Sequence, residues 1–227
     1  MGYANGPRIV TDGLALHLDA GNAKSYPGSG TSWYDLSGNG KHFTWSAEPT
    51  HNTGGVPSLE TYGKTCVGPA SNSFGITDAG GYTFFVAVIQ NSILNSYSWR
   101  WPGSVGYGRG IFAHQTWSNE YTYFDQGGCC GWDTRIYGRF FDTTTKWSFG
   151  IFRRKGAERR LYQNLRTTAV TTTAAQNILL DSNGARVVDL TGWNAKLGLF
   201  LVYNRGLEDA EVEQTYRALK SRFLITE

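Results

Sequence analysis

Cysteine is scarce in this sequence: the 227 residues include only Cys66, Cys129 and Cys130. Their number is odd, two of the three are adjacent, and no pair has C-x-x-C spacing. This pattern does not fit the disulfide framework of a small secreted domain, and it favours folding in a reducing compartment. The adjacent pair lies in the glycine-rich stretch "GGCCGW", and the sequence assigns no chemical role to it.

Charge and long apolar runs are limited as well. Charged residues make up 17% of the chain and the formal net charge is +3, which is too mild for the basic stripe of a nucleic-acid-binding module. The longest purely apolar run, Phe84 to Ile89, is far shorter than the roughly 20 residues that a membrane-spanning helix needs. The beginning of the sequence has no apolar segment of the kind that directs secretion. We therefore expect neither a nucleic-acid partner nor insertion into a membrane.

The common catalytic patterns are missing too. His17, His42, His51 and His114 are too widely spaced for a zinc motif. No G-x-S-x-G elbow, Walker loop or G-x-G-x-x-G sequence leading into a helix is present. Retaining glycosidases need two carboxylates facing one cleft, whereas the densest acidic stretch here, 208–213, reads as helical. We expect no enzymatic activity, and a glucanase-like glycoside hydrolase is the least favoured alternative.

The chain is rich in residues typical of β-sheets and turns. Aromatic residues make up 15% of the sequence, and glycine occurs 29 times. Leu14, Leu16 and Leu18 recur with a period of two, which predicts a first strand half-buried in the fold. Turn-rich stretches separate most of the further predicted strands, at 41–46, 73–77, 82–90, 110–114, 121–124, 132–141, 146–153, 159–165 and 196–203. The expected fold class is all-β, a sandwich or barrel.

A single helix is predicted near the end of the chain, from about 209 to 223. Its apolar side chains recur at helical spacing, and Glu208 and Glu211 place carboxylates at its start, where the helix dipole favours them. No linker or internal repeat divides the sequence, so we expect one domain over 1–227. Residues 48–62 and 91–110 are the expected excursions, and 91–145 reads as an insertion or long loop region.

The stretch "SYPGSGTSWYDLSGNG", residues 25–40, admits two interpretations. Asp35, Ser37 and Asn39 alternate, so their oxygens are candidate ligands for calcium, although the stretch lacks the final carboxylate of an EF-hand loop. Alternatively, Asp35 and Asn39 close Asx-type turns while Gly38 and Gly40 supply positive φ angles, and no ion is required. The turn is the favoured interpretation.

Aromatic residues are densest between Tyr97 and Phe141. In an extended strand, the stretch "SYSWRWPGSVGYGRG" places Tyr97, Trp99 and Trp101 on one face and Arg100 on the other. Flat rings beside a guanidinium can stack on sugars. Burial of these rings between two sheets is the competing and favoured interpretation. The candidate glycan-binding residues are Tyr97, Trp99, Arg100, Trp101 and Tyr107.

Basic residues cluster in "RRKGAERR", residues 153–160, which reads as a hairpin with its turn at 155–158. Such a cluster could dock on an acidic partner. More commonly, charges at a hairpin tip are solvated and protect strand edges from aggregation. The candidate docking residues are Arg153, Arg154, Lys155, Arg159 and Arg160.

Both ends of the chain resemble a known family. The stretches "GLALHLDAGNAKSYPGSGTSWYDLSGNGKHFT" (13–44) and "LGLFLVYNRGLEDAEVEQTYRALKSRF" (197–223) resemble the concanavalin A-like, or LamG-like, domains of virion proteins from tailed phages, especially marine ones. Between them, "YTFFVAVI" (82–89) and "KWSFGIFRRKGAERRLYQNL" (146–165) are similar to that family's central strands. The chain departs from the pattern at Glu208, where Ser usually caps the helix, and at Leu165, where Gly usually follows the Asn.

This resemblance implies a concanavalin A-like jelly-roll sandwich of two antiparallel sheets with one C-terminal helix. It also implies a virion structural protein, a capsid decoration or an appendage- or fibre-associated protein, assembled in the bacterial cytoplasm. The implied partners are other virion proteins, a host-surface glycan and, as an open point, further copies of the chain. A glycan-binding adhesin is the alternative main role.

Overall fold

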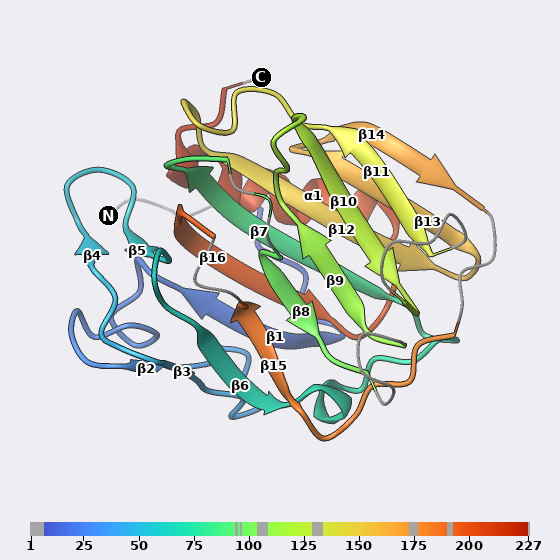
Figure 1. The fold of residues 1–227 in the computed structure, drawn as a ribbon, viewed down its shortest axis with the longest axis horizontal. Coiled ribbons are helices and arrows are strands. Elements are labelled where there is room, and N and C mark those ends of the chain that lie inside the picture. Colours follow the sequence, from blue (N-terminus) through green and yellow to red (C-terminus); the bar gives the residue numbers. More distant parts are fainter. Residues whose placement is uncertain are drawn as a thin grey trace.

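The computed structural model describes residues 7–93, 95, 97–103, 109–128, 134–172, 177–189 and 193–226. Two antiparallel sheets pack face to face, and one helix lies on the outer face of the first sheet (Figure 1). Their inner faces enclose the main apolar core. This arrangement confirms the predicted all-β jelly-roll sandwich, and the described residues form a single α-helix, α1 (Asp209–Leu219), near the C-terminal end.

The first sheet, sheet A, has eight strands, seven of them in one row, and β1 pairs with β16 beside that row. In spatial order the row is β14 (Arg166–Thr171), β13 (Glu158–Gln163), β12 (Ser148–Lys155), β7 (Tyr82–Gln90), β16 (Ala195–Tyr203), β5 (Ser58–Glu60) and β4 (His51–Asn52), with β1 (Leu14–Asp19) on β16.

The second sheet, sheet B, also has eight strands. In spatial order they are β11 (Arg135–Arg139), β10 (Tyr121–Gln126), β9 (Ile111–His114), β8 (Trp99–Trp101), β15 (Gly184–Val188), β6 (Cys66–Ala70), β3 (Phe43–Trp45) and β2 (Ser32–Trp33).

The apolar run in β7 is explained by its central place in sheet A. Phe84, Val86 and Val88 face the core between the sheets, whereas Phe85 and Ala87 face a second cluster beneath α1. Because both faces are covered, the strand has no polar side and reads as continuous rather than alternating. Tyr82–Gln90 is therefore a strand with the predicted bounds.

Helix α1 packs on sheet A through the apolar face that its spacing predicts. Tyr216 contacts Phe149 edge to face with ring centroids 5.9 Å apart. The predicted helix ends with one 3₁₀ turn, η2 (Lys220–Phe223), in which Phe223 is buried. At the other end, the backbone N–H of Glu208 donates to Glu211 Oε2 over 2.8 Å, as in a capping box. Within the described residues, no helix has the length and apolarity needed to cross a bilayer.

The start of the described chain is bound to the same side of the molecule. The N–H of Val10 donates to Thr215 Oγ1 in α1 over 3.3 Å, and the hydroxyl of Tyr203 donates to the Val10 carbonyl over 2.9 Å. Val10 and Ile225, which lie near the two ends of the description, both belong to the cluster beneath α1. Both ends of the described chain are thus held against the helix-covered face.

Some sequence-based expectations need correction. Residues 73–77 are not a strand: η1 (Ser71–Phe74) is a 3₁₀ turn that Gly75 ends with a φ of 72°. Residues 48–62 contain β4 and β5, and 91–110 contain β8. These strands span only two or three residues, too few for a period of two to be visible.

The stretch 91–145, set apart in the sequence as an insertion or long loop region, contributes β8 to β11 to sheet B. Its last strand, β11, lies against β14 of sheet A, so the two sheets approach each other along one side of the sandwich. The approach is close: a Cβ placed on Gly138 would lie 2.5 Å from Thr168 Oγ1. Glycine is required there because the other sheet occupies the space of a side chain.

Candidate functional sites

The structure places a hydrogen-bonded turn at residues 35–41, in which Asp35 closes an Asx-type turn as expected, whereas Asn39 contributes as a donor through its amide. Asp35 Oδ1 accepts the backbone N–H of His17 and of Ser37, each over 2.9 Å. Asp35 Oδ2 accepts the Ser37 hydroxyl over 2.7 Å and the N–H of Lys41 over 3.1 Å. The Asn39 amide donates to Ser37 Oγ and to a backbone carbonyl of β1, each over 2.9 Å. The carboxylate therefore ties this turn to the first strand of sheet A.

Glycines complete the turn, since Gly38 has a φ of 90° and Gly40 one of 67°. Asp35, Ser37 and Asn39 thus form the hydrogen-bonded frame of a turn, and calcium binding by their oxygens stays a prediction. In the part of the chain that the structure describes, no three His, Cys, Asp or Glu side chains group as a metal site would require.

The basic hairpin forms as predicted, but its side chains are not a docking patch. Arg153 and Arg159 are only 2% and 1% exposed. Arg153 donates to the Leu207 carbonyl over 3.0 Å and forms ion pairs with Asp209 and Glu158. Arg159 donates to a backbone carbonyl just before β11 over 2.8 Å.

The other cations of this hairpin also have partners inside the molecule. Arg154 pairs with Asp78, Lys155 with Glu208, and Arg160 with Glu158 over 2.6 Å. Partial burial opposes ionisation of Glu158, but hydrogen bonds from Arg153 and Arg160 outweigh it and lower the pKa of this carboxyl. Burial contradicts the docking and solvated-tip interpretations for Arg153 and Arg159, whereas Lys155 at the tip is exposed, as the solvated-tip alternative expects.

Trp99 and Trp101 are fully buried, so their assignment as glycan-binding residues is wrong. They do share one face of β8, as predicted, but this face points into the core. Arg100 lies on the opposite, outer face, where its Nε is 2.9 Å from a carboxylate oxygen of the fully buried Asp189. Burial raises the pKa of Asp189 despite its two arginine neighbours, Arg100 and Arg186.

Tyr97 precedes β8 and does not share the tryptophans' environment. Its ring lies 4.3 Å from the ring of His114 and 5.8 Å from that of Phe112, which point away from the core. Tyr97 is half-buried and remains a candidate for a surface contact. Tyr107, Cys129 and Cys130 lie outside the described residues.

The outer face of sheet B carries an array of partly exposed rings, which we call the tyrosine face: Tyr97, Trp117, Tyr121, Tyr123 and Tyr137. Tyr121 and Tyr123 alternate along β10, and Tyr137 of β11 is the cross-strand partner of Tyr123. The Tyr137 ring lies 5.6 Å from that of Tyr121 and 5.7 Å from that of Tyr123, and it is 46% exposed. Three tyrosine rings thus adjoin on one surface.

A buried charge network lies next to these rings. Arg135 Nε and Nη2 each donate to one carboxylate oxygen of Asp125 over 2.7 Å. The Arg135 guanidinium lies 4.5 Å from the centroid of the Tyr123 ring, and His114 Nε2 is 3.4 Å from Asp125 Oδ2. Burial would raise the pKa of Asp125, but its bonds to Arg135 and His114 lower it, so the carboxylate stays ionised at neutral pH. This pair fixes the guanidinium over the ring.

Sequence reasoning located the dense aromatic region but selected β8, whose tryptophans are buried, rather than the partly exposed rings of β10 and β11. The informative signal was alternation in "YTYFDQ" (121–126) and "RIYGR" (135–139), where rings and charges occupy every second position. Aromatic and charged residues on the same side of neighbouring strands are typical of an exposed sheet face rather than a core face.

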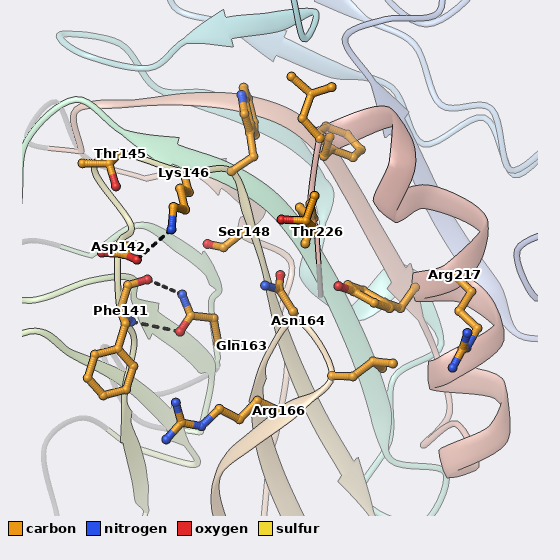
Figure 2. A pocket seen from close by; sticks show the side chains of 16 residues that line it. Phe141, Asp142, Thr145, Lys146, Ser148, Gln163, Asn164, Arg166, Arg217 and Thr226 are labelled. Carbon is orange, nitrogen blue, oxygen red and sulfur yellow. Dashed lines mark hydrogen bonds and ion pairs between the residues drawn. The ribbon is translucent and has the colours of Figure 1, made fainter.

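A pocket of about 770 Å³ lies at a different place, at one end of sheet A (Figure 2). The loop before β12, the β13–β14 turn and the C-terminal residues after α1 enclose it. Its apolar lining includes Trp147, Leu165 and Leu224, and its polar lining includes Ser148, Asn164 and Arg166. Gln163 closes one side, where its amide accepts the Phe141 N–H over 2.9 Å and donates back to the Phe141 carbonyl over 2.5 Å.

No protein-family model and no curated protein matches the sequence. Solved structures do match: the binding domain of Paraclostridial mosquitocidal protein 1 has a TM-score of 0.70 at 12% identity, covering 91% of this chain and 52% of that one. The binding domain of botulinum neurotoxin DC, in complex with SialylT, has a TM-score of 0.69 at 11% identity, covering 92% and 52%. The chain spans about half the length of these two structures.

A third solved structure is covered almost entirely. Domain 4 of an extracellular arabinanase from Geobacillus stearothermophilus, in complex with arabinotriose, has a TM-score of 0.68 at 14% identity, covering 89% of this chain and 98% of that one. At such low identity the likeness concerns the fold. The chain therefore has the jelly-roll sandwich fold of these binding domains.

Proposed function

We propose that this protein is a carbohydrate-binding module and that the tyrosine face of sheet B holds the sugar. The observation that carries the proposal is the adjoining rings of Tyr121, Tyr123 and Tyr137 beside the fixed guanidinium of Arg135. Flat rings stack on the apolar faces of sugars, and a fixed ion pair supplies directed hydrogen bonds to hydroxyl groups. The face combines both kinds of contact.

The solved structures of the same fold support this choice of ligand. One was determined with SialylT and another with arabinotriose; a sialidase from Trypanosoma rangeli in complex with sialic acid, of which this chain covers 33%, has a TM-score of 0.66. Those ligands belong to those proteins, at 11–14% identity to this chain. They support a saccharide as the first class of ligand to test.

We further propose that the face binds without catalysing a reaction. Asp125 is ionised and both of its carboxylate oxygens accept hydrogen bonds from Arg135. An acid held in this way orients a neighbouring group, whereas a general acid needs a transferable proton. The finer assignment, a phage decoration or appendage protein that displays this module, rests on the sequence resemblance at both ends and stays a prediction.

The test is binding of the purified protein to a panel of neutral and acidic oligosaccharides, followed by titration calorimetry with the best ligand. We expect Tyr121→Ala and Tyr137→Ala each to weaken binding about fivefold, since one stacking contact contributes on the order of 1 kcal/mol. Tyr62→Ala is the matched control, because Tyr62 is 59% exposed and lies in the turn between β5 and β6, away from the tyrosine face. Equal affinities of all three variants and the wild type would overturn the proposal.

A further inference from the structure

We propose that the pocket at the end of sheet A is a second ligand site, separate from the tyrosine face, and that it takes a sugar bearing a carboxylate. This inference rests on the proposed function, carbohydrate binding, and adds a second site, the pocket, with acidic sugars as its ligand class. The volume of about 770 Å³ lies within the range of roughly 300–1,000 Å³ that is typical of small-molecule sites.

The pocket presents polar groups to a ligand. Ser148 is 2% exposed, and its hydroxyl has no hydrogen-bond partner among the described residues. Leaving such a buried hydroxyl unpaired is unfavourable, so a ligand that hydrogen-bonds to it removes part of that penalty. Asn164 also lines the pocket; its Oδ1 accepts the N–H of Phe149 over 2.9 Å, which fixes the orientation of its amide group. Figure 2 shows Ser148 and Asn164 in the middle of the lining side chains.

The charge at the rim is positive. Lys146 and Asp142 form an ion pair over 3.2 Å and offset each other. Arg166 forms no ion pair with an acidic residue in the described part of the chain, and its guanidinium lies 5.1 Å from the Phe141 ring centroid. A planar guanidinium held against a ring is well suited to bidentate binding of a carboxylate.

The walls favour a sugar over a simple fatty acid. Trp147 and Leu165 supply apolar surface for the face of a sugar ring, while Ser148 and Asn164 supply hydroxyl partners. A hydrocarbon chain would cover the two polar groups without bonding to them, which costs free energy. An acidic sugar meets the apolar, polar and cationic parts of the pocket together.

The test is a titration of the wild-type protein with a glucuronate-terminated disaccharide and with its neutral glucose counterpart, followed by amide chemical shifts. We expect the acidic disaccharide to bind at least about tenfold more tightly, because an ionic hydrogen bond contributes more than a neutral one. Shifts should concentrate at 141–148 and 163–166. Arg166→Gln and Ser148→Ala should each weaken acidic binding several-fold.

Arg139→Gln is the matched control, since Arg139 also lies against Phe141, at 5.2 Å, but does not line the pocket. Equal binding of the two disaccharides, or equal losses in Arg166→Gln and Arg139→Gln, would overturn the inference. Tyr137→Ala separates the two proposals. If it abolishes acidic binding while Arg166→Gln leaves it intact, the tyrosine face is the acidic-sugar site and only the pocket inference fails.

Discussion

The indole of Trp99 stacks on the ring of Phe84 across the interior of the sandwich, with centroids 4.7 Å apart and planes inclined by 25°. Trp99 also meets Phe152 edge to face at 5.0 Å, so this side chain joins β8 of sheet B to β7 and β12 of sheet A. A residue in this position stabilises the pairing of the sheets and contacts no external ligand.

Trp99→Ala should therefore lower the free energy of unfolding by about 3–5 kcal/mol, the usual cost of removing a large buried aromatic side chain. Urea denaturation measures this loss. Any sugar affinity should remain once the folded fraction is taken into account. A stable Trp99→Ala variant with selectively lost binding would show that the indole reaches a ligand.

The buried guanidinium of Arg153 gives a second prediction. Arg153→Met removes the partner of Asp209 and Glu158 and the donor to the Leu207 carbonyl. We expect a loss of roughly 1–3 kcal/mol in the free energy of unfolding, because a buried carbonyl loses its donor. Lys155→Met is the control: its pair with Glu208 is exposed on both sides, and such pairs contribute about 0–1 kcal/mol. Equal effects in denaturant titrations would argue against a structural role for Arg153.

The lowered pKa of Glu211 predicts how the stability of the folded protein changes in acid. Two hydrogen bonds from Arg205 lower the pKa of the Glu211 carboxyl to about 2, from the ordinary value of 4.5. Since the folded state favours the ionised form, this stabilisation is present above pH 4.5 and is lost as the pH falls toward 2. Melting temperatures between pH 6 and pH 2 should fall less steeply in Glu211→Gln than in the wild type. Glu213→Gln, which alters an exposed pair with Arg217, should keep the wild-type slope.

The contact between the sheets at Gly138 supplies a fourth prediction. Gly138→Ala would place a Cβ 2.5 Å from Thr168 Oγ1 and 2.8 Å from the Thr168 carbonyl oxygen, so β11 and β14 must move apart. We expect a loss of about 1–3 kcal/mol by thermal or urea unfolding. Gly54→Ala is the control, since nothing lies within 4 Å of a Cβ there. If both variants unfold alike, the close approach of the sheets does not constrain this position.

The longest periodic elements were predictable from the sequence because local pattern determines them. β1 and β7 have the expected bounds, and the helix begins at Asp209 as expected. Period two also placed Trp99 and Trp101 on one face, but it cannot tell an inner face from an outer one. That choice depends on which sheet lies opposite, and only the assembled sandwich determines it.

The basic cluster at 153–160 was interpreted incorrectly for a related reason. Arg153, Arg154 and Arg160 look like an exposed cluster in sequence, yet their partners include Asp78 and Asp209, which lie far along the chain. Pairing over such separations leaves no local signal. The tyrosine face likewise draws Tyr97, Tyr123 and Tyr137 from separate segments, so the density of aromatic residues in the sequence indicated the region but selected only Tyr97 of these three.

The packing of Val10 and Ile225 beneath α1 bears on how the protein can be immobilised or fused to a carrier. Both residues pack on the outer, helix-covered face of sheet A, whereas the tyrosine face is the outer face of sheet B. A sensor chip, bead or fused carrier attached near Val10 or Ile225 would hold the sandwich from the helix-covered face of sheet A. The surface carrying Tyr121 and Tyr137 would then point into solution, open to a polymer or cell surface approaching from the front.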